Sequence, residues 1–132
     1  MLKLEIVTPE KRVLDTEVDS VTVPTASGEA GILPNHAPLI SALKPGILSY
    51  SSKGAVEKFA VAGGFVEVSS DRVAVLTDIA ESPGEISVEA ARGEREAAEK
   101  ELAASQSAAL EETEAVRERI ETANVRLQLA GK

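Results

Sequence analysis

The chain has 132 residues, about the length of one domain, and its 14 basic and 22 acidic side chains give a net charge of −8. This charge, together with only three aromatic residues, excludes nucleic-acid binding through the overall field or through base stacking, and it disfavours binding to an anionic membrane surface. The lack of cysteine excludes disulfides and thiolate metal sites, and we predict neither a signal peptide nor a membrane-spanning helix.

Residues 1–84 are predicted to form short β-strands. Apolar and polar side chains alternate along residues 2–6, as they do in a half-buried strand. Residues 18–23 are rich in β-branched side chains, and we expect Pro24 to end that strand. Further strands are predicted at residues 47–50, 56–61, 65–68 and 73–76, with turns between them. Strands at this spacing predict a small sandwich or barrel.

The composition changes at Pro83 and Gly84. All six prolines and all three aromatic residues precede residue 85, whereas 11 of the 20 alanines follow it. Pro-Gly is also turn chemistry. We therefore predict a domain boundary here, with a β domain, sandwich or barrel, over residues 1–84 and a two-helix hairpin over residues 85–132.

Two helices are predicted in the second part, with Ser87 as the N-cap of the first and a break at residues 105–107. The apolar seam of the second helix is predicted to contain Ala109, Thr113, Val116, Ile120, Ala123, Leu127 and Ala130. Alanine buries little apolar surface, so the hairpin is expected to be weakly held and able to change conformation. An ordinary charged helical tail is the alternative interpretation of the same pattern.

No catalytic constellation is found in the sequence. One histidine among many serines and aspartates does not define a catalytic triad. Gly63 and Gly64 lack the Lys and Ser/Thr of a phosphate-binding loop and are interpreted as a bulge or tight turn. His36 lies between Pro34 and Pro38, and we interpret it as a structural hydrogen-bonding residue rather than a metal ligand. The chain is therefore not expected to be an enzyme.

Residues 28–39, Gly-Glu-Ala-Gly-Ile-Leu-Pro-Asn-His-Ala-Pro-Leu, resemble the signature loop of the ε subunit of bacterial F-type ATP synthases. Residues 4–10, 43–48, 63–68 and 73–77 are similar to further segments of that family, in the same order. In the helices the resemblance is one of length, alanine content and position. It implies an N-terminal all-β sandwich, a C-terminal αα-hairpin and a non-catalytic rotor subunit of the central stalk.

The resemblance also implies partners. The sandwich would grip the γ subunit and sit on the membrane-embedded c-ring, at the cytoplasmic face of the cell membrane, where it couples proton flow to ATP synthesis. Membrane contact would be made only through the complex. The expected docking residues lie in one loop, with Glu29 toward the c-ring and His36 toward γ. These residues are Glu29, Gly31, Pro34, His36 and Pro38.

Regulatory residues are implied in the hairpin, which would either fold onto the sandwich or extend into the α/β catalytic head and block ATP hydrolysis. Arg117, Arg119 and Arg126 are expected to meet an acidic segment of the catalytic subunit, because guanidinium groups pair well with carboxylates. Some bacterial members bind ATP through an Ile/Leu-Asp-x-x-Arg-Ala motif. The Asp and Arg of that motif are Ser87 and Ala90 here, so no cofactor is expected.

Three alternatives stay open from the residues alone. An enzyme that uses paired carboxylates has the least support, because no acid/base pair is identifiable. The three arginines would have no regulatory role if they only balance neighbouring glutamates, as Arg117 would with Glu121 one helical turn later. A free-standing adaptor that binds a partner through its hairpin would have a similar pattern of helices and strands. Co-purification with γ and c subunits would distinguish the rotor subunit from the adaptor.

Overall fold

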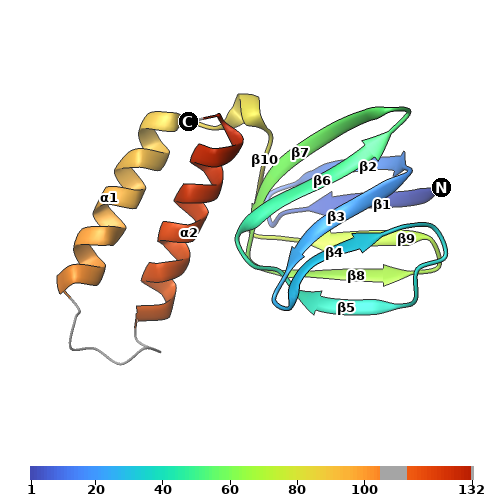
Figure 1. Cartoon of the computed structure of the whole chain (residues 1–132), viewed down its shortest axis with the longest axis horizontal. Helices are drawn as coiled ribbons and strands as arrows, with labels where there is room; N and C mark the ends of the chain where they lie inside the picture. The colour runs from blue at the N-terminus through green and yellow to red at the C-terminus, as the bar shows by residue number, and fades with distance from the viewer. Residues whose placement is uncertain (105–112, 132) are drawn as a thin grey trace.

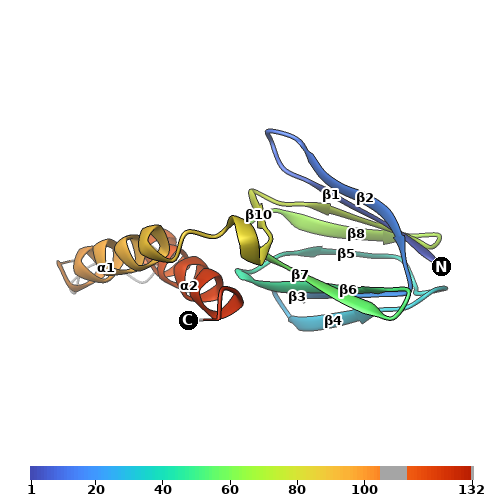
Figure 2. The same ribbon diagram turned by 90° about the horizontal axis from the view of Figure 1, so that it is seen from above.

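A computed structural model describes residues 1–104 and 113–131. Two five-stranded sheets pack face to face, and two helices lie side by side beyond one end of them (Figures 1 and 2). The predicted fold class, an all-β sandwich followed by an αα-hairpin, is confirmed.

The first sheet has the strand order β2-β1-β9-β8-β5, and β1 and β9 are parallel whereas the other neighbours are antiparallel. Its strands are β1 (Leu2–Val7), β2 (Arg12–Val18), β5 (Leu39–Ala42), β8 (Phe65–Ser69) and β9 (Arg72–Leu76). The second sheet has the order β10-β7-β6-β3-β4 and is antiparallel throughout. Its strands are β3 (Ser20–Thr25), β4 (Gly28–Ile32), β6 (Gly46–Ser52), β7 (Ala55–Ala62) and β10 (Ile79–Glu81).

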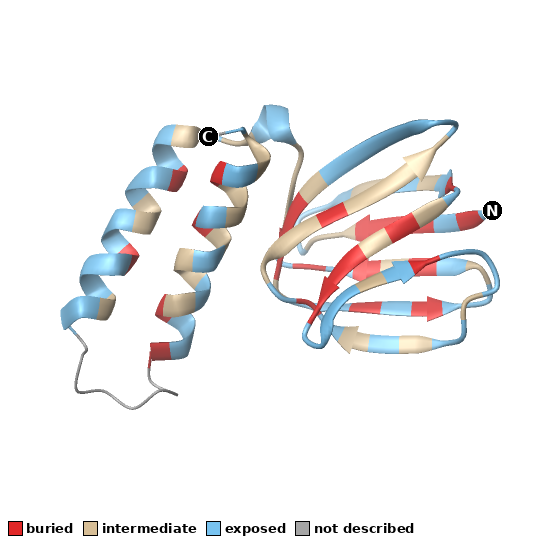
Figure 3. Cartoon of the chain, viewed as in Figure 1, coloured by how far each residue is buried: buried red, intermediate tan, exposed pale blue. Residues whose placement is uncertain are grey.

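The core lies between the two sheets and is filled by Leu, Ile and Val (Figure 3). Burial alternates along β8 and β9, as the two-residue period of a strand requires. The fully buried side chains include Leu2, Leu4, Ile6, Ile32 and Leu48. This packing confirms the alternation predicted for residues 2–6.

The strand predicted at residues 18–23 is wrong in its bounds. Val18 ends β2 in the first sheet, and the chain crosses to the second sheet at Asp19 before β3 begins. Asp19 fixes this crossing, because its N–H donates to Ser51 O at 2.7 Å and its Oδ2 accepts the Lys53 N–H at 3.2 Å. A single β-branched run thus contains the end of one strand and the start of another.

Pro24 does not end its strand, contrary to the sequence prediction. It is buried within β3, where it lies opposite Glu29 of β4. The pairing of β3 with β6 stops at Thr22, so no ladder partner requires an N–H at Pro24. Its carbonyl accepts the Lys44 N–H at 3.1 Å.

The helices are α1 (Val88–Ala104) and α2 (Glu114–Leu129). Ser87 caps α1 as predicted, since its Oγ accepts the Ala90 N–H at 3.1 Å. Between the sandwich and α1, the carboxylate of Glu85 accepts hydrogen bonds from Ser82, which lower the pKa of Glu85. The predicted break at residues 105–107 and the seam residue Ala109 lie outside the described residues.

The buried seam of α2 agrees with the prediction at Thr113, Val116, Ala123 and Leu127. The buried residues of α1 and α2 lie on the sides of the two helices that face each other (Figure 3). The seam therefore packs α2 on α1. Across residues 1–104 and 113–131, no helix is long and apolar enough to span a bilayer.

Candidate docking surfaces and hairpin contacts

The segment predicted as one docking loop, residues 29–38, has two different structures. Its first part, Glu29 and Gly31 included, belongs to strand β4 at the edge of the second sheet, and only residues 33–38 form a connecting turn. The prediction of a single loop is wrong because the backbone from Gly28 to Ile32 pairs with β3. Glu29 lies near the start of β4 and His36 beyond its end, so the two do not form one compact site.

The turn at residues 33–38 is held by the connection between β8 and β9. Asn35 has a φ of 69°, and its N–H donates to Asp71 Oδ1 at 2.7 Å. The backbone N–H of His36 donates to Leu33 O at 3.2 Å, and its Nδ1 lies 2.7 Å from Ala37 O. The histidine thus makes hydrogen bonds within its own turn.

The predicted docking residues are all at least partly accessible, on β4 and on the turn. Glu29, Gly31, Pro34 and Pro38 are exposed and His36 is half-buried. Strand β5 continues directly from Pro38 along the edge of the first sheet. A partner at the turn would therefore also reach the outer face of that sheet.

An apolar row crosses the outer face of the first sheet, and sequence reasoning missed it. Ala42 pairs with Phe65, Phe65 with Leu76, and Leu76 with Val7, so the four side chains line up across β5, β8, β9 and β1. Phe65 is 44% exposed and Leu76 is 39% exposed, and the neighbouring Ile40 is 72% exposed. We call these five residues the apolar row. Exposed apolar side chains that adjoin one another in this way make the row a candidate interaction site.

The rest of that outer face is charged. The Glu5 carboxylate is largely buried, accepts a hydrogen bond from Arg72 and lies 3.7 Å from Arg12 Nη2. Lys3 Nζ lies 3.6 Å from Asp15 Oδ1 on the neighbouring strand. These opposite charges pair across strands, so they stabilise the sheet locally and leave the apolar row as the distinct feature of the face.

Arg119 joins the two helices of the hairpin. Its Nε lies 2.6 Å from Glu94 Oε1 and its Nη1 lies 2.6 Å from Glu101 Oε2. The two glutamates are two helical turns apart on α1, so one guanidinium reaches both. These hydrogen bonds raise the pKa of Arg119.

Arg126 joins the hairpin to the sandwich. Its Nε lies 2.5 Å from Glu81 Oε1 at the end of β10, and the two side chains are 24% and 29% exposed. Arg117 Nε donates to Thr113 Oγ1 at 3.2 Å, one turn earlier on α2. Two of the three predicted regulatory arginines thus hold carboxylates on other elements, a pairing that local spacing did not reveal.

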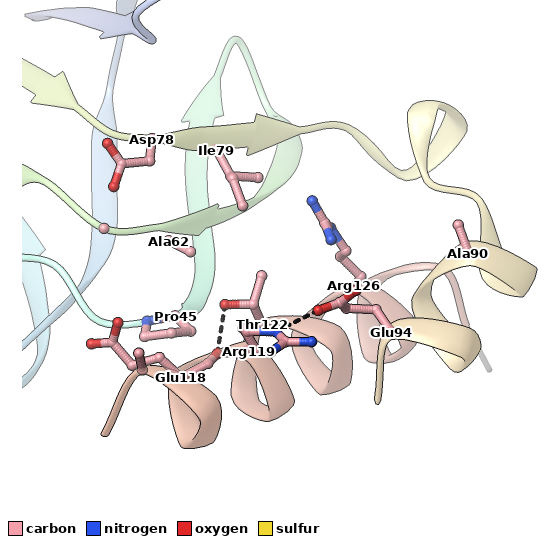
Figure 4. Close-up of a pocket in the computed structure, with 12 residues that line it drawn as sticks. Pro45, Ala62, Asp78, Ile79, Ala90, Glu94, Glu118, Arg119, Thr122 and Arg126 are labelled. Atoms are coloured by element: carbon pink, nitrogen blue, oxygen red, sulfur yellow. Dashed lines mark hydrogen bonds and ion pairs between the residues drawn. The ribbon is translucent and has the colours of Figure 1, made fainter. Parts of the chain in front are cut away.

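A pocket of about 480 Å³ lies between α2 and the end of the sandwich (Figure 4). The arginines that line it, Arg119 and Arg126, are the two that already pair with glutamates. Ala90 lines it from α1, where the ATP motif of the resembled family has arginine. Within the described residues, no group of three His, Cys, Asp or Glu side chains is arranged to hold a metal ion.

Comparison with known proteins finds similarity over the sandwich and over about three quarters of the chain. A family model described as ATP synthase, Delta/Epsilon chain, beta-sandwich domain, matches residues 1–83. The ATP synthase epsilon chain of Desulforamulus reducens is 50% identical over 100 residues, 76% of each chain. That of Carboxydothermus hydrogenoformans is 50% identical over 102 residues, 77% of this chain and 76% of the relative.

A solved structure is similar over nearly the whole length. It is the Euglena gracilis mitochondrial ATP synthase, described as OSCP/F1/c-ring in rotational state 1, and one of its chains has a TM-score of 0.79 at 27% identity. The match covers 99% of this chain and 81% of that chain. The similarity therefore includes the helices as well as the sandwich.

The chain has a β-sandwich followed by a helical hairpin, and it matches these proteins. Its class is therefore that of a non-catalytic subunit of an ATP synthase. The chain belongs to the ATP synthase delta/epsilon chain family. The resemblance read from the sequence motifs is confirmed. The alternative of a free-standing adaptor is left without support.

Proposed function

We propose that the chain is a central-stalk rotor subunit that couples proton flow through a c-ring to ATP synthesis by way of γ. The observation that carries this proposal is the match over 99% of the chain to a subunit of a synthase structure that includes F1 and the c-ring. The subunit would work at the cytoplasmic face of the cell membrane and reach the membrane only through its partners.

The docking surface for γ would run along the outer face of the first sheet. It would begin at the turn that holds His36, follow β5 and end across the apolar row, which begins with Ile40 and Ala42 on that strand. Proline at positions 34 and 38 stiffens the turn, so little conformational entropy is lost on docking. Glu29, on the edge strand of the other sheet, would face the c-ring.

Cysteine cross-linking tests this arrangement, because the chain has no cysteine of its own. In the assembled complex, cysteine at position 29 is expected to cross-link to c, and cysteine at position 36 to γ. Cysteine at Val56, exposed on the second sheet, serves as a control that should cross-link to neither. Efficient cross-linking of either docking position to the catalytic β subunit would contradict the proposal.

The hairpin would inhibit ATP hydrolysis when it leaves the sandwich and contacts the catalytic head. A chain that ends at Gly84 is expected to fold, because every residue of the buried core cluster lies within residues 2–75. It is expected to assemble, to support ATP synthesis and to raise hydrolysis by about fivefold or more, the low end of regulatory coupling. Hydrolysis assays on the whole complex check this.

A triple alanine variant of Arg117, Arg119 and Arg126 is expected to reproduce most of that rise. If hydrolysis is unchanged in the triple variant but raised by the deletion, the arginines are not the inhibitory contact. If neither change raises hydrolysis, the hairpin does not inhibit this enzyme.

ATP is expected not to bind the isolated chain at micromolar concentrations. A nucleotide site needs a cation directed at the phosphates, and Ala90 supplies none. Binding to Arg119 or Arg126 would require phosphate to displace glutamates already within 2.6 Å of them. Isothermal calorimetry checks this, and micromolar affinity would show the expectation to be wrong.

A further inference from the structure

The ion pair between Glu81 of β10 and Arg126 of α2 connects the sandwich to the hairpin. We infer that this pair is a latch: it holds the hairpin on the sandwich, and its release both frees the hairpin and exposes Arg126. Only the regulatory consequence of the latch rests on the function proposed above.

The hairpin contacts the sandwich through α2, which lies against β6 and β7. The buried seam of α2, formed by Val116, Ala123 and Leu127, faces α1 (Figure 3). On the side toward the sandwich, α2 lines a pocket of about 480 Å³ with Ala115, Glu118, Arg119, Thr122 and Arg126. Figure 4 shows four of these side chains, Glu118, Arg119, Thr122 and Arg126. The pocket interrupts the contact of α2 with β6 and β7, so dispersion contacts are lost over that part of the interface and the ion pair adds to an incomplete packing.

The geometry of the pair gives it more strength than an ordinary surface ion pair. Arg126 Nε and Glu81 Oε1 are 2.5 Å apart, and at least 70% of each side chain is shielded from solvent. By contrast, Lys100 and Glu96 on α1 are 3.4 Å apart and 78% and 71% exposed. A pair shielded from water interacts more strongly at the same charge, since the effective dielectric constant is lower.

The ion pairs of Arg119 and Arg126, both on α2, have different roles. Arg119 pairs with Glu94 and Glu101, which lie on α1, so these contacts can move with the hairpin as a unit. Arg126 pairs with Glu81 of the sandwich, so that contact must break before the hairpin leaves. Arg126 therefore cannot hold the sandwich and contact the catalytic head at the same time.

The distance between the two parts of the isolated full-length chain tests the latch. Spin labels on cysteines at Glu57 of β7 and Glu121 of α2, both exposed, report this distance by pulsed electron resonance. A single narrow distribution of distances is expected for the labelled parent. Glu81→Gln and Arg126→Gln are each expected to raise the ratio of detached to attached hairpin by about tenfold, as expected for loss of a charge-assisted hydrogen bond.

Salt and a charge swap separate the ion pair from packing. Raising sodium chloride from about 0.05 to about 1 M is expected to detach the parent hairpin progressively and to affect the Glu81→Gln chain much less. Exchanging the partners, Glu81→Arg with Arg126→Glu, is expected to recover most of the attached population. Lys100→Gln, which removes the exposed pair on α1, is the matched control and should leave the distance unchanged.

Three results would overturn the latch. The first is a parent distance in the single variants at every salt concentration. The second is an effect of Lys100→Gln as large as that of Arg126→Gln, and the third is release in the single variants without recovery in the charge swap.

In the whole complex, Glu81→Gln frees the hairpin but keeps Arg126, so it is expected to lower ATP hydrolysis. Unchanged hydrolysis with a released hairpin would contradict the regulatory role proposed for the hairpin and leave the latch itself intact.

Discussion

Replacing Gly64 with alanine is expected to lower the free energy of unfolding by about 3–5 kcal/mol, a large part of the stability of a small domain. Gly64 has a φ of 84°, and a Cβ added there would lie 1.8 Å from the backbone oxygen of Leu76. Only a shift of β8 against β9 relieves that contact, and such a shift disturbs the pairing of Phe65 with Leu76. Urea unfolding followed by far-ultraviolet circular dichroism measures the loss.

Gly54→Ala is the matched control for that substitution. Gly54 has a similar φ of 81°, but nothing lies within 4 Å of its added Cβ. Gly54→Ala is expected to lower the free energy of unfolding only by the cost of a left-handed backbone at alanine, about 1–2 kcal/mol. Equal losses at the two glycines would show that the approach of Leu76 does not determine the stability at Gly64.

Phe65→Glu is expected to weaken binding of the chain to γ by about 30-fold or more, with little change in folding. An interface centre that buries an aromatic side chain commonly loses this much when the ring is removed, and a carboxylate there also has to be desolvated. The side chain is 44% exposed and lies outside the core between the sheets. Titration of γ with the purified chain in a surface-binding assay gives the ratio of dissociation constants.

Val56→Glu is the control for that experiment. Val56 is 62% exposed on β7 in the second sheet, away from the proposed docking face. A change of less than about threefold is expected there, as for residues outside an interface centre. If both glutamates weaken binding equally, net charge rather than the apolar row governs the association.

The sequence predicts correctly those features of the fold that depend only on residues close together in the chain. The alternation in residues 2–6, the turn between the strands predicted at residues 47–50 and 56–61, and the break at Gly63 and Gly64 are all present in the structure. Each of these features follows from side-chain period or from the positive φ that glycine favours. The cap at Ser87 follows from equally local hydrogen bonding.

The strands that sequence reasoning missed lack a strong local signal. β2 has one fully buried residue, Val18, and otherwise mixes charged and half-buried positions. β4 contains two glycines, β5 has four residues, and β10 has three. These strands form because a neighbouring strand supplies hydrogen bonds, which no short window of sequence displays.

The surfaces of interest are assembled from distant segments. The apolar row takes one or two side chains from each of four strands. Phe65 is the residue whose sequence could best have indicated the row, but it lies on the same face of β8 as the exposed Glu67. Arg126 and Glu81 are 45 residues apart. Spacing placed Arg126 beside the apolar seam of its helix, but only the tertiary fold identifies its carboxylate partner.

The parallel pairing of β1 with β9 has a consequence for how the chain folds during synthesis. Lys3 lies opposite Arg72, so β1 obtains its second neighbour only after the ribosome has made almost the whole sandwich. At about 5–20 residues per second, β9 follows β1 by roughly 4–14 seconds. During that interval Leu2, Leu4 and Ile6 lack their final enclosure. Contacts of such high sequence separation also slow the search for the native topology, so we expect nascent chains stalled before β9 to be the ones that engage chaperones.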